Sequence, residues 1–305
     1  MELHQQDDSI FWFDLEANGL KEFISIYIII DEKISIIETG PASGHARLLD
    51  ALSTLKINPD DVSYIIPTHI HLDHFGGGGH LMEVCKNAEA IVHPRALSHV
   101  INPEKLWSGS QKVLGKIADL YGKPKPIDSN RVYSVSDGDV INLGTANLKA
   151  IFTPGHAPHH ITWVKGKTAF VGDSLGLWYK DLKRAFPVTP PRYDHNLALD
   201  SISIMKKLDL EWLNYTHFGP RESEGALVQV EEEFNAWMDI VHRGFTNNSS
   251  PEEILELLLD EREGLVGSQH SDHPIQFNFG SERAATHIVS VHGMLDWLRR
   301  SNDKS

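Results

Sequence analysis

Residues 68–80 read Thr-His-Ile-His-Leu-Asp-His-Phe-Gly-Gly-Gly-Gly-His. They follow the apolar run Val62–Ile66, whose length and composition are typical of a buried strand. Three histidines and one aspartate fall within residues 69–74, and these side chains are ligands that borderline divalent metals accept. The glycines that follow allow close backbone approach. The stretch therefore predicts a metal site in a loop at the end of a strand.

Three later segments also place a histidine or an aspartate at the end of an apolar run. The carboxyl ends of strands in an α/β sheet tend to converge on one edge, so we expect these side chains to meet the histidine-rich loop. Together they would supply the remaining ligands of a site for two metals. The segments are Thr153-Pro154-Gly155-His156, Val171-Gly172-Asp173 and Thr216-His217-Phe218-Gly219.

In their order and flanking residues, these motifs resemble the metallo-β-lactamase-fold hydrolases, and most of all the glyoxalase II-like branch. The resemblance covers roughly residues 20–220. It implies two divalent metal ions, zinc first, with iron or manganese as alternatives. It implies that one ion is held by His69, His71 and His156, that the other is held by Asp73, His74 and His217, and that Asp173 bridges both.

The same resemblance implies an α/β fold, the four-layer αββα sandwich with the site at one edge of two sheets. The sequence agrees with this, since short apolar runs alternate with amphipathic stretches up to about Gly225. Beyond it, Val228–Val241, Pro251–Arg262 and Ala284–Arg300 show helical periodicity. We therefore expect a catalytic domain at residues 1–223 and a C-terminal helical region at 224–305, none of whose residues the chemistry requires.

Two metal ions that share a water lower its pKa from about 15.7 towards neutrality, which gives a bound hydroxide as nucleophile. Asp73 is the catalytic candidate, because a carboxylate there would orient the hydroxide and accept its proton. Glu38 ends an apolar run where related proteins usually carry aspartate, and we expect it to support a ligand histidine. His160, four residues after His156, is a second supporting candidate, and Tyr179 is a candidate for contact with substrate.

Composition narrows the class of partner. The chain has 305 residues, with 41% hydrophobic and 23% charged residues, which excludes a disordered chain. Its net charge of −14 argues against nucleic acid, because phosphate binding needs a positive face. Cys85 is the one cysteine, so no intrachain disulfide can form. We expect a cytoplasmic protein without a membrane span that acts on a small molecule, with a homodimer left open.

The favoured reaction is hydrolysis of a small ester, thioester or lactone. Two alternatives share the first motif. A phosphodiesterase of the tRNA-processing type would need a basic recognition arm, and the candidates for one are only Lys123–Lys125 and Lys180–Arg184. A mononuclear iron-dependent sulfur dioxygenase would need only two histidines and one aspartate, which leaves His74 and His217 without a role.

Overall fold

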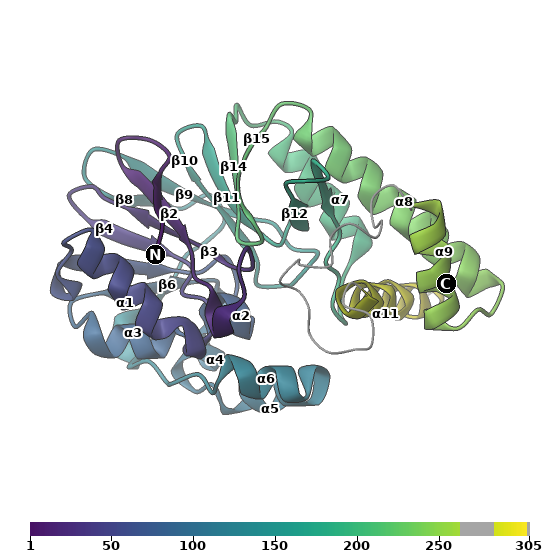
Figure 1. Cartoon of the computed structure of the whole chain (residues 1–305), viewed down its shortest axis with the longest axis horizontal. Helices are drawn as coiled ribbons and strands as arrows, with labels where there is room; N and C mark the ends of the chain where they lie inside the picture. The colour runs from purple at the N-terminus through teal and green to yellow at the C-terminus, as the bar shows by residue number, and fades with distance from the viewer. Residues whose placement is uncertain (263–283, 304–305) are drawn as a thin grey trace.

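The computed structural model describes residues 1–262 and 284–303, in which two large β-sheets pack face to face (Figure 1). The first sheet runs in chain order from β1 to β7; neighbours are antiparallel up to β4 and parallel from there on. Its strands are β1 (Leu3–Gln5), β2 (Ile10–Asp14), β3 (Ser25–Ile29), β4 (Ile34–Ile37), β5 (Val62–Ile66), β6 (Glu89–Val92) and β7 (Val132–Ser134).

The second sheet has the order β15-β14-β11-β10-β9-β8, and its one parallel pair is β11 with β14. A separate ribbon of β12 (Leu177–Tyr179) and β13 (Arg184–Phe186) lies beside it. The strands of the second sheet are β8 (Val140–Asn142), β9 (Asn147–Phe152), β10 (Ile161–Lys165), β11 (Thr168–Gly172), β14 (Trp212–Tyr215) and β15 (Gly219–Glu222).

Three apolar clusters define four layers. The middle cluster lies between the sheets and contains residues of both, among them Tyr27, Ile66, Trp163 and Phe170. Tyr27 also donates a hydrogen bond across the sheets to the carbonyl of Tyr215, at 2.6 Å. The outer clusters pack helices against each sheet, and the expected αββα sandwich is therefore confirmed.

The helices on the first sheet connect its parallel strands, which need a crossover rather than a tight turn. Gly115, with φ +56°, separates two consecutive helices in this layer, α5 and α6. Cys85 is fully buried in the same layer. The helices are α1 (His45–Thr54), α2 (Leu72–Phe75), α3 (Gly78–Val84), α4 (Leu97–Ile101), α5 (Glu104–Leu114) and α6 (Lys116–Tyr121).

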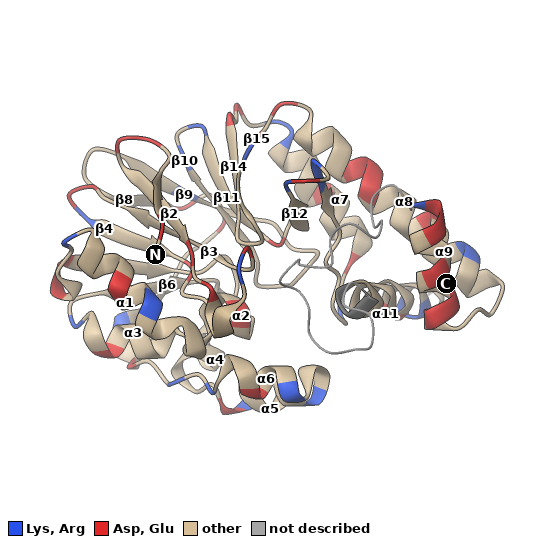
Figure 2. Cartoon of the chain, viewed as in Figure 1, with Lys and Arg blue, Asp and Glu red and all other residues tan. Residues whose placement is uncertain are grey.

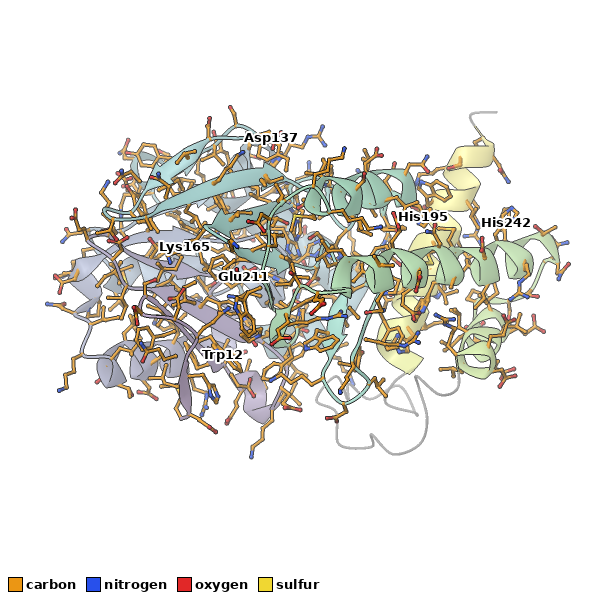
Figure 3. The ribbon with its side chains drawn as sticks, turned by 90° about the horizontal axis from the view of Figure 1, so that it is seen from above. Trp12, Asp137, Lys165, His195, Glu211 and His242 are labelled. Carbon is orange, nitrogen blue, oxygen red and sulfur yellow. The ribbon has the colours of Figure 1, made fainter. Side chains whose placement is uncertain are left out.

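The helices of the second outer layer are α7 (His195–Met205), α8 (Ala226–Thr246), α9 (Pro251–Glu261) and α11 (Ala284–Asn302). Helix α8 extends from the sheets toward the far end of the molecule, where His242 lies (Figure 3). Ser250 and Glu253 form a capping box at the start of α9. None of the described helices is both long and apolar enough to cross a lipid bilayer.

The C-terminal helical region is thus present, but its apolar cluster continues across residue 223. The cluster joins Tyr215 and Phe186 with Val230 and Trp237 of α8 and with Met294 of α11. The division into domains at 223 stays a prediction, and residues 263–283 and 304–305 of the second domain lie outside the described residues.

Candidate metal centre

The candidate site forms where strands of both sheets end at the same edge. In the first sheet, β4 and β5 are parallel, so Glu38 and the loop that begins at Thr68 leave the sheet side by side. In the second sheet, β11 and β14 are parallel, so Asp173 and His217 do the same. Strand β9 runs in the direction of β11, because each is antiparallel to β10, and it delivers His156 to this edge.

One group of ring nitrogens converges from the histidine-rich loop and from the loop after β9. His71 Nδ1 lies 2.9 Å from His69 Nε2 and 3.0 Å from His156 Nε2. These three residues form one of the groups in the described chain that could hold a metal ion. The arrangement gives three nitrogen donors on one side of the site, as a tetrahedral metal with an open position requires.

A second group lies across the site and combines a carboxylate with two histidines. Asp73 Oδ2 lies 3.5 Å from His217 Nε2 and 3.8 Å from His74 Nε2. These three residues form another group that could hold a metal ion. The second group thus offers one oxygen and two nitrogen donors.

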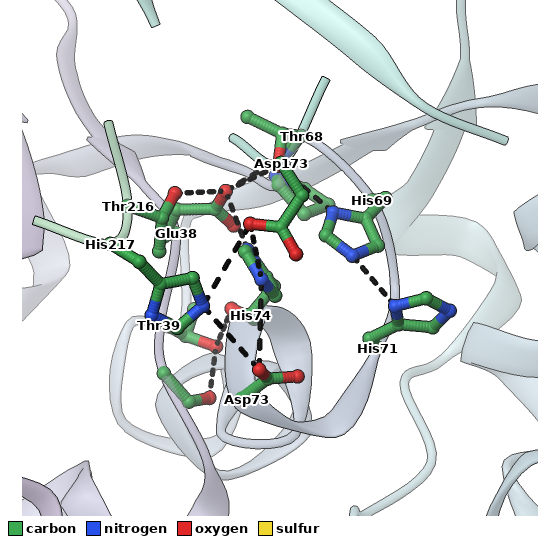
Figure 4. A network of polar contacts seen from close by, with 12 residues as sticks. Glu38, Thr39, Thr68, His69, His71, Asp73, His74, Asp173, Thr216 and His217 are labelled. Carbon is green, nitrogen blue, oxygen red and sulfur yellow. Dashed lines mark hydrogen bonds and ion pairs between the residues drawn. The ribbon is translucent and has the colours of Figure 1, made fainter. Parts of the chain in front are cut away.

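Asp173 lies between the two groups (Figure 4). Its Oδ2 is 3.4 Å from His156 Nε2, whereas its Oδ1 is 3.4 Å from His74 Nε2 and 3.8 Å from His217 Nε2. Gly172 makes this position possible, because its φ is +49° and a Cβ atom there would overlap Thr68 Oγ1 and the ring of His160. One carboxylate therefore presents an oxygen to each group.

The remaining nitrogen of four of these rings lies within hydrogen-bond distance of an oxygen. Such a contact fixes the orientation of a ring and leaves its other nitrogen free as a donor. A backbone carbonyl can only accept, so Nδ1 carries the proton in two of these rings and Nε2 points into the site. The pairs are His69 Nδ1 with Thr68 Oγ1 (3.2 Å), His74 Nδ1 with Glu38 Oε1 (3.2 Å), His156 Nδ1 with the Val188 carbonyl (2.8 Å) and His217 Nδ1 with the Phe23 carbonyl (2.6 Å).

Glu38 connects both sheets beneath the site. Its Oε1 accepts hydrogen bonds from Thr68 Oγ1 at 2.5 Å and from Thr216 Oγ1 at 3.2 Å, besides its contact with His74. The side chain is fully buried, and Glu38 has a φ of +68°, a conformation costly for a residue with a side chain. The structure thus places Glu38 directly against one candidate ligand and, through Thr68, against a second.

The structure places the other two supporting candidates differently. His160 is fully buried; its Nε2 accepts a hydrogen bond from the Asp173 backbone N–H at 3.2 Å, and its Nδ1 lies 2.9 Å from Thr153 Oγ1. It is therefore bound to the backbone of the central carboxylate. Tyr179 lies on β12, and its ring packs edge-on against Phe186 at 5.4 Å. Its contact with substrate stays a prediction.

The electrostatics of the site favour a bound cation. Burial lowers the pKa of His69 and His71 well below the ordinary value, and neighbouring histidines lower it further. Burial opposes charge on Asp73, but His74 and His217 lower its pKa to about 2. Burial also lowers the pKa of His74, yet Asp173, Asp73 and Glu38 together raise it well above the ordinary value. Three carboxylates thus require positive charge at this place.

Two buried atoms in the described residues also suit a bound metal ion, because they have no hydrogen-bond partner within the protein. They are His74 Nε2 and Asp173 Oδ1, which face one another at 3.4 Å. Buried polar atoms normally have partners, and a ring nitrogen and a carboxylate oxygen are both metal ligands. The donor set therefore fits divalent metal ions.

Sequence reasoning missed Thr68 and Thr216, although each directly precedes a histidine of the motifs, which was a usable signal. It also missed Tyr121 on α6. Burial raises the pKa of the Tyr121 phenol well above its ordinary value, and the charges of Asp73 and Asp173 raise it further. No sequence signal could identify the carbonyls of Phe23 and Val188, because every residue carries one.

The fold and this pair of donor groups define a class of metal-dependent enzymes, which bind their metal ions at the edge of an αββα sandwich. The model of the metallo-beta-lactamase superfamily matches residues 21–217. The chain belongs to this superfamily, which confirms the resemblance noted in the sequence, and it is an enzyme of this group of hydrolases.

Several known proteins are similar to this chain. The metallo-beta-lactamase fold-containing protein ST1585 of Sulfurisphaera tokodaii is 28% identical over 228 residues, which span 72% of this chain and 84% of that protein. The crystal structure of the Sulfolobus tokodaii protein ST1585 covers 95% of this chain and 98% of its own, with a TM-score of 0.65 and 23% identity. This likeness shows the fold.

Two further relatives match over shorter stretches. The N-acyl homoserine lactonase AttM of Agrobacterium fabrum is 31% identical over 112 residues, 37% of this chain and 39% of that protein. Glyoxylase B2 of Dictyostelium discoideum is 24% identical over 160 residues, 48% of this chain and 51% of that protein.

Proposed function

We propose that this protein is a hydrolase that cleaves a small ester, thioester or lactone with two divalent metal ions, zinc first and iron or manganese as alternatives. The position of Asp173 carries the proposal, because its two oxygens face histidines of two different donor groups. An enzyme with one metal would have no use for the second group of Asp73, His74 and His217. This arrangement favours hydrolysis over the one-iron dioxygenase.

The residues around the site have separate tasks. Two divalent ions held there supply a nucleophile at neutral pH and polarise the carbonyl oxygen of a substrate. His69, His71 and His156 would bind one ion, and Asp73, His74 and His217 the other. Asp73 is ionised at neutral pH, since its pKa is about 2, so its carboxylate can bind a cation and accept a hydrogen bond. Glu38 and His160 hold the donors in place from outside.

A small substrate with a carbonyl group agrees with the charge and with the relatives. The chain carries a net charge of −14, and Lys and Arg are interspersed with Asp and Glu along its outer helices (Figure 2). Such a surface does not suit a polyanion such as tRNA. Two relatives are named as a lactonase and a glyoxylase, and a lactone and a thioester are both acyl compounds that a polarised carbonyl would activate.

The test is metal analysis of protein purified without added metal, followed by assays with a nitrophenyl ester, a thioester, an N-acyl homoserine lactone and a nitrophenyl phosphodiester. We expect two metal ions per chain and cleavage of one of the three acyl substrates. His71→Ala should abolish this cleavage, whereas the matched control His242→Ala, at an exposed position on α8, should leave it unchanged. One iron per chain, with oxygen consumption and no acyl cleavage, would contradict the proposal.

A further inference from the structure

A short segment, Pro187–Pro190, joins the candidate metal centre to the last helix of the chain. It follows β13 and is here called the strap. The carbonyl of Val188 accepts the hydrogen bond from His156 Nδ1 at 2.8 Å. This bond keeps the proton on Nδ1, so Nε2 is free to face His71 and Asp173.

The strap is the partner that orients this ring. The backbone just before His156 is held by other elements, since the Gly155 carbonyl accepts from the Asp194 N–H at 2.9 Å and the Pro154 carbonyl from Ser201 Oγ at 2.7 Å. Those contacts fix where the chain runs but leave the imidazole free to rotate. The direction of Nε2 therefore depends on where Val188 lies.

Helix α11 holds the strap through Ser290 and Thr189, which are both fully buried. Thr189 Oγ1 donates to the Ser290 carbonyl at 2.8 Å, and the Thr189 N–H donates to Ser290 Oγ at 3.2 Å. Ser290 Oγ in turn donates to the Pro187 carbonyl at 3.2 Å. Two of these bonds hold the residue after Val188, and the third holds the residue before it.

Gly293, one turn further along α11, lets the helix touch the strap with its backbone. A Cβ atom at this position would overlap the carbonyl of Thr189 and contact that of Pro190. The chain after the strap is bound to the same helix, because Arg300 Nη2 donates to the Tyr193 carbonyl at 2.6 Å. A displacement of α11 must therefore displace the strap.

We propose that Ser290 and Gly293 are positioning residues for His156, which act through the carbonyl of Val188. The last helix then belongs to the metal centre, contrary to the expectation that the chemistry needs no residue of the C-terminal region. This inference rests on the proposed function only in that His156 binds a metal ion. It adds that affinity for one of the two ions depends on the contacts of α11 with the strap.

The test measures zinc affinity by competition with a chelator, together with thermal unfolding of the metal-free protein. Ser290→Ala removes two of the three bonds, and Thr189→Val removes the third with little change of shape. Loss of a contact that orients a ligand typically weakens metal binding about 10- to 100-fold, and we expect about 10-fold for one ion in each variant. The double variant should lose little more than either single variant, because both act through the same strap.

Two controls separate positioning from general stability. Ser301→Ala is the matched substitution on α11, where the hydroxyl donates to the Trp297 carbonyl of the same helix. Leu298→Ala removes a buried side chain of α11 and should lower the unfolding temperature. Both should bind zinc within twofold of the wild type. Gly293→Ala should weaken zinc binding at least as much as Ser290→Ala; if it fails to fold, the serine and threonine variants still decide the question.

The outcomes distinguish this inference from the proposed function. If Ser290→Ala and Thr189→Val bind both ions within twofold of the wild type, the inference is refuted and the proposed function stands. The same holds if Leu298→Ala weakens zinc binding as strongly as they do. A wild-type protein that binds none of zinc, iron and manganese would refute both. Cobalt absorption spectra give a second readout, in which only the strap variants should alter the coordination bands.

Discussion

Replacement of Glu38 by glutamine gives the sharpest test of how the site is supported. The substitution keeps the shape of the side chain and one carbonyl-type oxygen but removes the charge. Three side-chain groups depend on that charge, namely the hydroxyls of Thr68 and Thr216 and the ring of His74. We expect Glu38→Gln to destabilise the metal-free protein and to weaken metal binding.

The size of the effect follows from these three contacts. A hydrogen bond to a charged group contributes about 1.5–3 kcal/mol and one to a neutral group about 0.5–1.5 kcal/mol, so each contact loses about 1 kcal/mol. The sum is about 3 kcal/mol. A chain of 305 residues has an unfolding entropy of about 0.6 kcal/mol/K, which converts this loss to about 5 °C in unfolding temperature.

The assay is thermal unfolding of the metal-free variant and the wild type at one scan rate, followed by titration with zinc. Glu83→Gln is the matched control, because Glu83 is exposed and makes one surface ion pair with Lys125 at 2.5 Å. We expect it to change the free energy of unfolding by less than about 0.5 kcal/mol. A shift of 1 °C in unfolding temperature corresponds to less than about 1 kcal/mol for a chain of this length. If Glu38→Gln unfolds within 1 °C of the wild type, Glu38 does not make these hydrogen bonds as described.

Four further predictions concern the metal ions and the C-terminal helices. His71→Ala should lose one metal ion and nearly all hydrolysis, which metal analysis and turnover will show; two ions retained would contradict its role. Asp73→Asn should lower turnover by more than its loss of metal explains, and unchanged turnover per bound ion would mean that Asp73 is only a ligand. Removal of metal with a chelator should lower the unfolding temperature, because ions at 100 times their dissociation constant add about 2.7 kcal/mol to the stability of the folded state. Equal unfolding temperatures with and without the ions would mean that the ions do not stabilise the folded protein. Glu233→Gln should destabilise the protein by about 2 kcal/mol, because buried Glu233 pairs with both Arg184 and Arg262. Its metal content should stay the same. An unchanged free energy of unfolding would show that these ion pairs contribute nothing to stability.

Strand β5 was predictable because its apolar run is typical of a buried strand. β5 has the bounds that the sequence indicates, Val62–Ile66. β2 was missed although it is as long as β5, because acidic residues on both sides obscure its five-residue run. β12 and β13 were missed because three-residue strands carry too little periodicity to be distinguished from a loop.

The histidines and aspartates of the candidate site could be named from the sequence, because their chemistry and their place after strands are local properties. The sequence also indicated Glu38 and His160 as neighbours of the site. It could not indicate which ring nitrogens face one another, nor that Asp173 lies between two groups. Those facts depend on the packing of two sheets whose strands are far apart in the chain.

The chain itself thus indicated the superfamily and the candidate donor residues, because these are encoded in residue types at short spacing. Only the tertiary structure decided what holds the donors in place. The carbonyls of Phe23 and Val188 orient two histidines, and no side chain distinguishes these carbonyls in the sequence. The link from Val188 to α11 is likewise a property of backbone groups that come together only when the last helix packs on the strap, since hydrogen bonds between distant segments follow from the fold and not from local sequence.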